Sequence, residues 1–252
     1  IDAASGGFIA PFQEGLPDWD FRLKNVLSIS ASGHKFGESC IGTGWVVWRQ
    51  RKNLSDHVAI SVSYLGGMGE SYNLNFSRPA SGIYVQYYKF LRYGISGYQK
   101  ICDHMMTHAQ KIREGLERMK FEGKPRFIIL DDGDRNCLPV VTAMLNPKCN
   151  FEYDDIDLQH AISEHNWYVS GYRMNFEDPI TKQDRPIFTD QEGSKSMFRI
   201  VVKNNINSVM VDNLIDSFVK TLEMLDSIEF KNKTNGTFKG IHRKKNLFSK
   251  HC

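Results

Sequence analysis

At residues 30–37 the sequence reads Ser30-Ala31-Ser32-Gly33-His34-Lys35-Phe36-Gly37. This stretch follows the apolar run Val26–Ser30, which is typical of a short buried strand. The strand therefore leads into a tight loop in which small residues surround one histidine and one lysine. Ser32 and His34 can hold an anion such as phosphate, and Lys35 projects an amine beside them. A lysine that forms an imine with an aldehyde must be held near its target and kept partly neutral.

A second segment, at the start of the chain, reads Asp2-Ala3-Ala4-Ser5-Gly6-Gly7-Phe8. Open α/β sheets place ligand-binding groups at the carboxyl ends of parallel strands, which is where we expect Asp2. In enzymes that use pyridoxal 5′-phosphate, a carboxylate beside the pyridine nitrogen keeps that nitrogen protonated. Ala4 is small enough to lie flat under a ring. Alone, each segment also fits a surface loop or a helix cap; together, in this order, they favour a cofactor site.

Composition indicates a globular protein. The 252 residues are 41% hydrophobic and 24% charged, which is enough apolar material for a buried core. The net charge of +3 comes largely from the basic tail after Lys231, which argues against a nucleic-acid-binding surface. No apolar run approaches the roughly 18 residues of a membrane span. The five cysteines are odd in number and lack CxxC spacing, so we expect no metal site and a reduced, cytoplasmic chain.

Periodicity predicts two kinds of architecture along the chain. The first 100 residues combine short strands, Val26–Ser30 and Gly44–Trp48, both read as buried, with a helix that Gly94 stops. The later part predicts a β-β-α-β-β-α unit of the α+β class. Its expected elements are a long amphipathic helix over Tyr98–Lys120, strands at Phe127–Leu130, Val140–Leu145, Trp167–Ser170 and Met197–Val202, and helices at Asp154–His165 and Ser208–Leu225. The expected domains are residues 1–110, residues 111–230, and a basic flexible tail over 231–252.

With these motifs in place, the sequence resembles the fold-type I, pyridoxal phosphate-dependent group II decarboxylases, and within them the glutamate decarboxylases. The resemblance is dense over residues 1–100 and looser beyond. The segments that match the family are Asp2–Phe12, Trp19–Leu23, Ser28–Gly37, Gly44–Arg49, Tyr64–Gly67, Asn75–Pro79 and Gln86–Arg92. The resemblance implies an α/β fold: part of an aspartate aminotransferase-like large domain, followed by a small α+β carboxyl-terminal domain.

The resemblance also implies roles for individual residues. Lys35 would form the aldimine with pyridoxal 5′-phosphate, with His34 as a second catalytic residue. Arg199 would hold a substrate carboxylate. The cofactor would be bound by Asp2 at the pyridinium nitrogen, by Ala4 at the ring, by Ser32 and His34 at the phosphate, and by Phe76 and Ser77 at the phosphate of a neighbouring subunit.

The roles implied for Arg199 and for a further residue, the carboxyl-terminal His251, have alternatives in the residues themselves. An arginine inside an apolar strand needs a partner, since an unpaired buried charge is costly. For Arg199 that partner could equally be a substrate carboxylate or an aspartate on a neighbouring element. The carboxyl-terminal His251 matches a histidine that closes over the active site in bacterial-type members, but a frayed basic terminus fits as well.

The expected reaction is decarboxylation of L-glutamate to 4-aminobutanoate and CO₂. The alternatives are a decarboxylase of another amino acid and a non-catalytic fragment or partner subunit. Chains of the family are nearly twice this length, so we expect this chain to act within a longer or split enzyme, as a homo-oligomer or with a complementary amino-terminal chain. By itself it should be poorly stable and inactive, because a central strand without neighbours leaves backbone groups unpaired. We expect no nucleic-acid or membrane partner.

Overall fold

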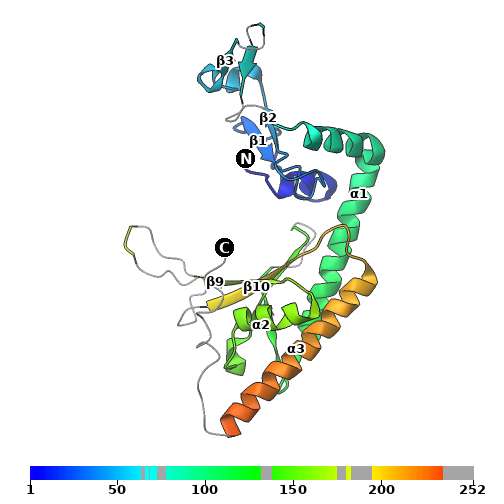
Figure 1. Ribbon diagram of the computed structural model, residues 1–252, viewed down its shortest axis with the longest axis vertical. Helices are drawn as coiled ribbons and strands as arrows, with labels where there is room; N and C mark the ends of the chain where they lie inside the picture. The colour runs from blue at the N-terminus through cyan, green and yellow to red at the C-terminus, as the bar shows by residue number, and fades with distance from the viewer. Residues whose placement is uncertain are drawn as a thin grey trace. The chain divides into compact units, whose positions relative to one another are not determined.

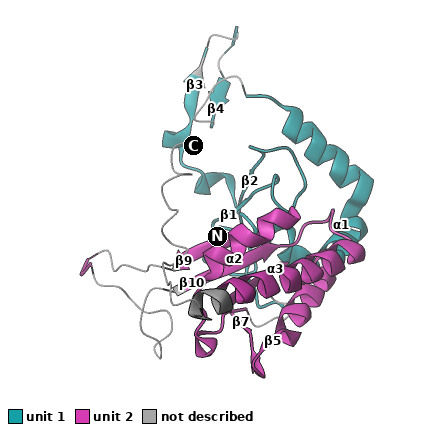
Figure 2. Ribbon diagram, turned by 60° about the horizontal axis from the view of Figure 1, so that its bottom comes forward, with its two compact units in different colours: residues 1–104 teal, residues 105–252 magenta. Residues whose placement is uncertain are grey.

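The computed structural model describes residues 1–63, 66–67, 69–72, 78–131, 138–174, 180–182 and 195–234. The chain divides into two compact units, Ile1–His104 and Met105–Cys252 (Figure 2). The division falls inside helix α1 (Ser81–Arg118). Among the residues described, no helix is both long enough and apolar enough to cross a membrane.

The first unit holds the two strands that the sequence predicts around the lysine loop. β1 (Ser28–Ala31) and β2 (Trp45–Trp48) pair antiparallel, with Ser28 opposite Trp48 and Ala31 opposite Trp45. Asp2 forms an isolated parallel bridge to Ser30, on the edge of β1 that β2 leaves open. The Asp2 segment and the strand that leads to Lys35 therefore lie side by side.

Short elements complete the first unit before α1. Two 3₁₀ turns follow the Asp2 segment and two more follow β2, while β3 and β4 form a small antiparallel pair. Their bounds are η1 (Gly6–Phe8), η2 (Ala10–Phe12), η3 (Arg51–Asn53), η4 (Asp56–Val58), β3 (Ile60–Val62) and β4 (Gly69–Ser71).

Helix α1 is two helical segments joined at Gly94, as the sequence predicts. Gly94 has φ 56° and ψ −166°, a left-handed conformation that non-glycine residues rarely adopt. The bend is visible where α1 turns sharply in Figure 1. The predicted apolar stripe of the second segment is confirmed at four positions that are at most 2% exposed, namely Met105, Ala109, Ile112 and Leu116.

The second unit confirms the predicted β-β-α-β-β-α order. Its four strands form one antiparallel sheet in the order β7-β8-β10-β9, with α2 packed against β9 and β10. The bounds are β7 (Phe127–Ile129), β8 (Val140–Leu145), α2 (Asp155–Ile162), β9 (Ser170–Met174), β10 (Lys195–Val201) and α3 (Ser208–Thr234). Smaller pieces are β5 (Lys120–Phe121), β6 (Lys124–Pro125), η5 (Pro147–Cys149) and η6 (Ser163–His165).

The core of the second unit lies between this sheet and its helices. Phe198 of β10 is fully buried and contacts Phe127 of β7 and Phe218 of α3, with ring centroids 5.4 and 5.6 Å apart. α3 presents a buried stripe at 3–4-residue spacing, consistent with an amphipathic helix. The stripe is Val211, Leu214, Phe218, Leu222 and Leu225.

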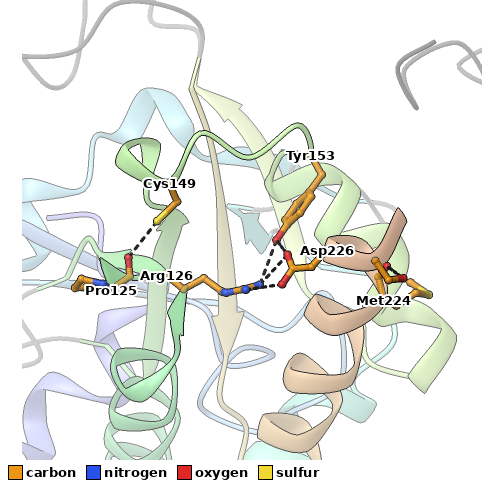
Figure 3. Close-up of polar contacts among 7 residues, drawn as sticks. Pro125, Arg126, Cys149, Tyr153, Met224 and Asp226 are labelled. Atoms are coloured by element: carbon orange, nitrogen blue, oxygen red, sulfur yellow. Dashed lines mark hydrogen bonds and ion pairs between the residues drawn. The ribbon is translucent and has the colours of Figure 1, made fainter. Parts of the chain in front are cut away.

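A partly buried ion pair ties three elements of the second unit together (Figure 3). Arg126, just before β7, contacts Asp226 of α3 through both carboxylate oxygens, at 2.6 and 3.3 Å. Tyr153, just before α2, donates to Asp226 Oδ1 at 2.7 Å. The guanidinium also lies over the rings of Phe121 and Phe151, at 4.9 and 5.3 Å from their centroids.

Three sequence-based expectations about these elements were wrong in detail. The strand expected at Trp167–Ser170 lies instead at Ser170–Met174, because the ladder with β10 begins at the pairing of Ser170 with Arg199. The final helix runs to Thr234, into the segment expected as tail. The strand expected to be buried at Gly44–Trp48 has all four of its β2 side chains 37–57% exposed. β2 has a neighbouring strand on one edge only, because its sheet has two strands. The composition of the segment does not reveal how many strands will pair with it.

Asp155, at the start of α2, is expected to make the stability of the second unit depend on pH. It is 2% exposed, and burial raises its pKa from 3.8 to about 6. The folded state therefore binds more protons than the unfolded state between about pH 4 and 6, so stability falls as pH rises through that window. A shift of this size corresponds to about 3 kcal/mol at most. We expect Asp155→Asn to flatten the dependence in urea titrations between pH 4 and 7.

The asparagine variant suits this test because it can keep both contacts of Asp155. Its oxygen can accept the Leu145 N–H bond, now 2.8 Å, and its amide can donate to Ser196 Oγ, now 2.7 Å from the carboxylate. The matched control is Asp216→Asn, which removes the same charge from an exposed position of α3. An unchanged pH dependence in Asp155→Asn would show that other groups are responsible.

Candidate active site

The turn that carries Asp2 lies directly beside the lysine loop. Ala3 N donates to Ser30 O at 2.9 Å, and Ser32 N donates to Ala4 O at 3.2 Å. Asp2 Oδ1 accepts the N–H of Ala4 at 3.0 Å, which closes the turn on itself. Backbone hydrogen bonds therefore pair the Asp2 turn with the start of the lysine loop.

Lys35 reaches across to that same turn. Its side chain is half-buried, and Nζ donates to Ser5 Oγ at 3.2 Å. Sequence reasoning gave no role to Ser5, although it stands in the matched segment. Ser5 stands three residues after Asp2 in the sequence. The contact therefore brings the amine of Lys35 to the turn that bears the Asp2 carboxylate. A primary amine held in place is the group that forms an imine with an aldehyde.

His34 points toward the connection that leads into β2. Its backbone N–H donates to Thr43 O at 3.2 Å, and its Nδ1 lies 2.8 Å from the same oxygen. Because a carbonyl oxygen can only accept, this contact is a hydrogen bond when Nδ1 carries the proton. Nε2 is then a donor to an anion only when the imidazole is doubly protonated.

Two glycines permit the close packing of the lysine loop. A Cβ built on Gly37 would lie 2.7 Å from Gly33 O and 2.9 Å from the Phe8 ring. One built on Gly33 would collide with the side chain of Gln86. The loop can therefore fold tightly between Ser32 and Gly37 only with glycine at both of these positions.

Arg199 belongs to the second unit and lies in β10. The neighbouring Phe198 and Ile200 are buried, whereas Arg199 is exposed, with its guanidinium 5.3 Å from the centroid of the Tyr172 ring. The sequence-based argument assumed that Arg199 is buried and therefore needs a partner. That assumption was wrong, because Arg199 is exposed. Strand alternation puts this side chain on the opposite face from the core.

Three predicted residues lie outside the described part of the chain, namely Phe76, Ser77 and His251. The residues that the structure does describe contain no group of three or more histidine, cysteine, aspartate or glutamate side chains able to hold a metal ion.

A strand that leads into a lysine loop, with an acidic turn in parallel beside it and an α+β unit later in the chain, defines a fold-type I pyridoxal phosphate-dependent enzyme. Similar solved structures bear this out. The glutamate decarboxylase of Lactobacillus brevis CGMCC 1306 aligns with a TM-score of 0.74 and 34% identity, over 90% of this chain and 46% of that one. A sphingosine-1-phosphate lyase of Burkholderia pseudomallei, at 17% identity, shares the fold with a TM-score of 0.63 over 95% of this chain and 49% of that one. The expected fold class is confirmed.

The chain belongs to the pyridoxal-dependent decarboxylase family. The family model described as "Pyridoxal-dependent decarboxylase conserved domain" matches residues 1–143. Glutamate decarboxylase of Lactococcus lactis subsp. lactis (strain IL1403) is 36% identical over 244 residues, 94% of this chain and 47% of that protein. Glutamate decarboxylase 5 of Arabidopsis thaliana is 33% identical over 228 residues, 90% and 42% respectively. The chain thus spans less than half the length of these relatives.

Proposed function

We propose that this chain provides the lysine-bearing part of an enzyme that converts L-glutamate to 4-aminobutanoate and CO₂ with pyridoxal 5′-phosphate. The observation that carries the proposal is the contact of Lys35 Nζ with Ser5 Oγ at 3.2 Å, on the turn that also bears Asp2. The choice of substrate rests on the relatives at 33–36% identity, which are glutamate decarboxylases.

The residues of the site fit the cofactor in chemical type. Lys35 offers a primary amine for its aldehyde, Asp2 a carboxylate for its ring nitrogen, and Ser32 and His34 offer donors for its phosphate. Ala4, whose backbone is fixed by bonds to both Asp2 and Ser32, offers a small apolar surface for its ring. When bound, pyridoxal phosphate supplies an electron sink for the charge left by departing CO₂.

The chain's own residues then have distinct tasks. Lys35 Nζ would hold the cofactor through its aldehyde, as the primary amine of the site. Asp2 would lie at the ring nitrogen, where a carboxylate favours the protonated form of the ring. His34, whose Nδ1 lies 2.8 Å from Thr43 O, would contribute its imidazole ring to the phosphate site. Arg199, on the solvent face of β10, is free of the core and suited to a substrate carboxylate.

We propose that the remainder of the site comes from polypeptide that corresponds to the other half of the relatives, in an oligomer or a longer protein. The exposed side chains of β2, Trp45 to Trp48, support this proposal because they leave apolar area on both faces of the strand for a partner to cover. We place the reaction in the cytoplasm, as the cysteine content indicates.

Borohydride reduction of the complete, cofactor-loaded enzyme, followed by peptide mapping, tests the proposal. The reduced cofactor is expected on Lys35, and CO₂ release is expected to be fastest with L-glutamate in a panel of amino acids. A label on another lysine would refute the assignment of Lys35. Labelling of Lys35 with no preference for glutamate would refute the substrate, and an unlabelled chain would favour a non-catalytic partner.

A further inference from the structure

The carbonyl oxygen of Gly37, two residues beyond Lys35, accepts two hydrogen bonds from α1. Gln86 Nε2 donates to it at 2.8 Å and Tyr98 Oη donates at 3.2 Å. Gln86 Nε2 also donates to Tyr98 Oη at 3.1 Å. Gln86 is 0% exposed and Tyr98 4% exposed, so water does not compete for these bonds. We call the three groups Gly37 O, Gln86 Nε2 and Tyr98 Oη the Gly37 bracket.

The bracket fixes the orientation of the Gln86 amide. Gly37 O can only accept, so the amide nitrogen must face it and the amide oxygen must face away. That oxygen, Gln86 Oε1, is buried without a hydrogen-bond partner among the described residues. It lies where a Cβ on Gly33 would be. Gln86 therefore touches the lysine loop at both of its glycines, one on each side of Lys35.

Stability alone does not explain a glutamine at this position. A buried amide oxygen without a partner is destabilising, whereas an apolar side chain of the same shape avoids that penalty. The flanking helix is otherwise rich in aromatic and aliphatic side chains. What Gln86 provides and an apolar residue cannot is a directed bond to Gly37 O.

The next two residues of the loop are also bound by α1. Glu38 has a left-handed φ of 60°, which is unfavourable for a non-glycine residue, and its carboxylate pairs with Lys89 Nζ at 2.9 Å. Ser39 Oγ donates to Gly82 O at 2.6 Å. Residues 37–39 are thus held one after another by the helix behind them, which leaves little freedom to the lysine two residues earlier.

We propose that Gln86 is a positioning residue which, with Tyr98, holds the lysine loop so that Lys35 Nζ is presented to the cofactor; this rests on the proposed function. Glycines flank Lys35 on both sides and would otherwise act as hinges. A group that reacts covalently needs its supporting residues fixed by packing and hydrogen bonds. Burial raises the pKa of Tyr98 to about 12, so its hydroxyl remains a donor over the working pH range.

The variant Gln86→Met tests the proposal in the cofactor-loaded enzyme. Methionine has a similar length and no donor, so it removes the bond to Gly37 O and keeps the volume. We expect the pyridoxal phosphate concentration needed for half-maximal borohydride labelling of Lys35 to rise about tenfold, which is ~1.4 kcal/mol. Backbone hydrogen exchange over residues 33–43 should also become faster.

Gln99→Met is the matched control. Gln99 lies on the same helix and its Nε2 donates to a backbone carbonyl, Phe12 O, at 2.7 Å, away from the lysine loop. It removes a comparable bond from the same helix and should leave Lys35 labelling unchanged. Tyr98→Phe is the second variant, used if Gln86→Met does not fold. It removes one hydroxyl and keeps the ring, and should raise the half-maximal concentration by a smaller factor, about twofold to fivefold.

The outcomes separate the two proposals. Weaker labelling in Gln86→Met and Tyr98→Phe but not in Gln99→Met supports the bracket. Equal labelling in wild type and both bracket variants overturns it and leaves the proposed function intact. Equal losses in all three variants overturn it as well, since the effect is then one of general stability. A wild-type enzyme that never labels at Lys35 overturns the proposed function, and the positioning role with it.

Discussion

Replacing Lys35 with alanine is expected to abolish borohydride-stable attachment of pyridoxal phosphate and to lower glutamate decarboxylation on the order of 10³-fold or more. Loss of one member of a catalytic group has effects of this size. The fold should tolerate the change, because Lys35 is only half-buried and lies in a loop rather than in a helix or strand. CO₂ release from L-glutamate measures activity, and circular dichroism checks folding.

Lys35→Arg separates amine chemistry from charge. Arginine keeps the positive charge and can still donate to Ser5, but its guanidinium does not lose a proton at working pH and so cannot attack an aldehyde. We therefore expect Lys35→Arg to be as inactive as Lys35→Ala. Lys24→Ala, at an exposed position of the same unit, is the control and should keep full activity. An active arginine variant would show that Lys35 contributes charge only.

The sequence predicted the order of elements well where local chemistry decides it. Gly94 interrupts α1 because it adopts φ 56°, and a glycine at that point of a helical pattern is a local signal. The strand Val140–Leu145 was predicted at its observed bounds, because only Thr142 interrupts its apolar run and Pro139 and Asn146 bound it. The predicted and observed elements agree where the residues of a segment determine its structure by themselves.

The sequence was less informative where a partner element decides the outcome. β9 begins at Ser170 because its ladder partner Arg199 lies there, although the apolar residues Trp167 to Val169 come earlier. Arg199 is exposed because alternation along β10 turns it away from Phe198. Neither fact is encoded in the segment itself, since each depends on which strand pairs with which and in what register.

The residues of the candidate site also differ in whether the local sequence or a distant element identifies them. Residues from Asp2 to Ala4 and from Ser32 to Lys35 could be named because each group is contiguous and carries unusual side chains. Gln86 could not be assigned a role, because it stands 49 residues beyond Gly37 and only the packing of α1 brings them together. A glutamine in an aromatic helix was the one available signal, and by itself it fits an exposed helix face equally well.

Replacing Asp226 with alanine is expected to lower the unfolding free energy of the second unit by about 3–5 kcal/mol, the range for breaking a buried pair. The reason is the arginine that the change leaves behind. The side chain of Arg126 is 7% exposed, whereas that of Asp226 is 27% exposed, so the guanidinium is the group that cannot recover its lost partner from water. The Tyr153 hydroxyl remains, at 3.2 Å from Arg126 Nη1, but as a neutral acceptor it does not balance the charge.

Hydrogen exchange of the β8 amides measures this effect in the second unit alone, with β1 as an internal reference in the first. The matched control is Glu114→Ala, which breaks the pair between Glu114 and Arg118 at 3.0 Å. Their side chains are 44% and 77% exposed, so the loss should stay within about 1 kcal/mol. Similar losses in the two variants would mean that burial does not govern the Arg126–Asp226 pair. A large loss for Asp226→Ala alone would show that the Arg126–Asp226 pair holds α3 against β7. Since β7 belongs to the sheet that carries Arg199, the pair would then also hold the helix against that sheet.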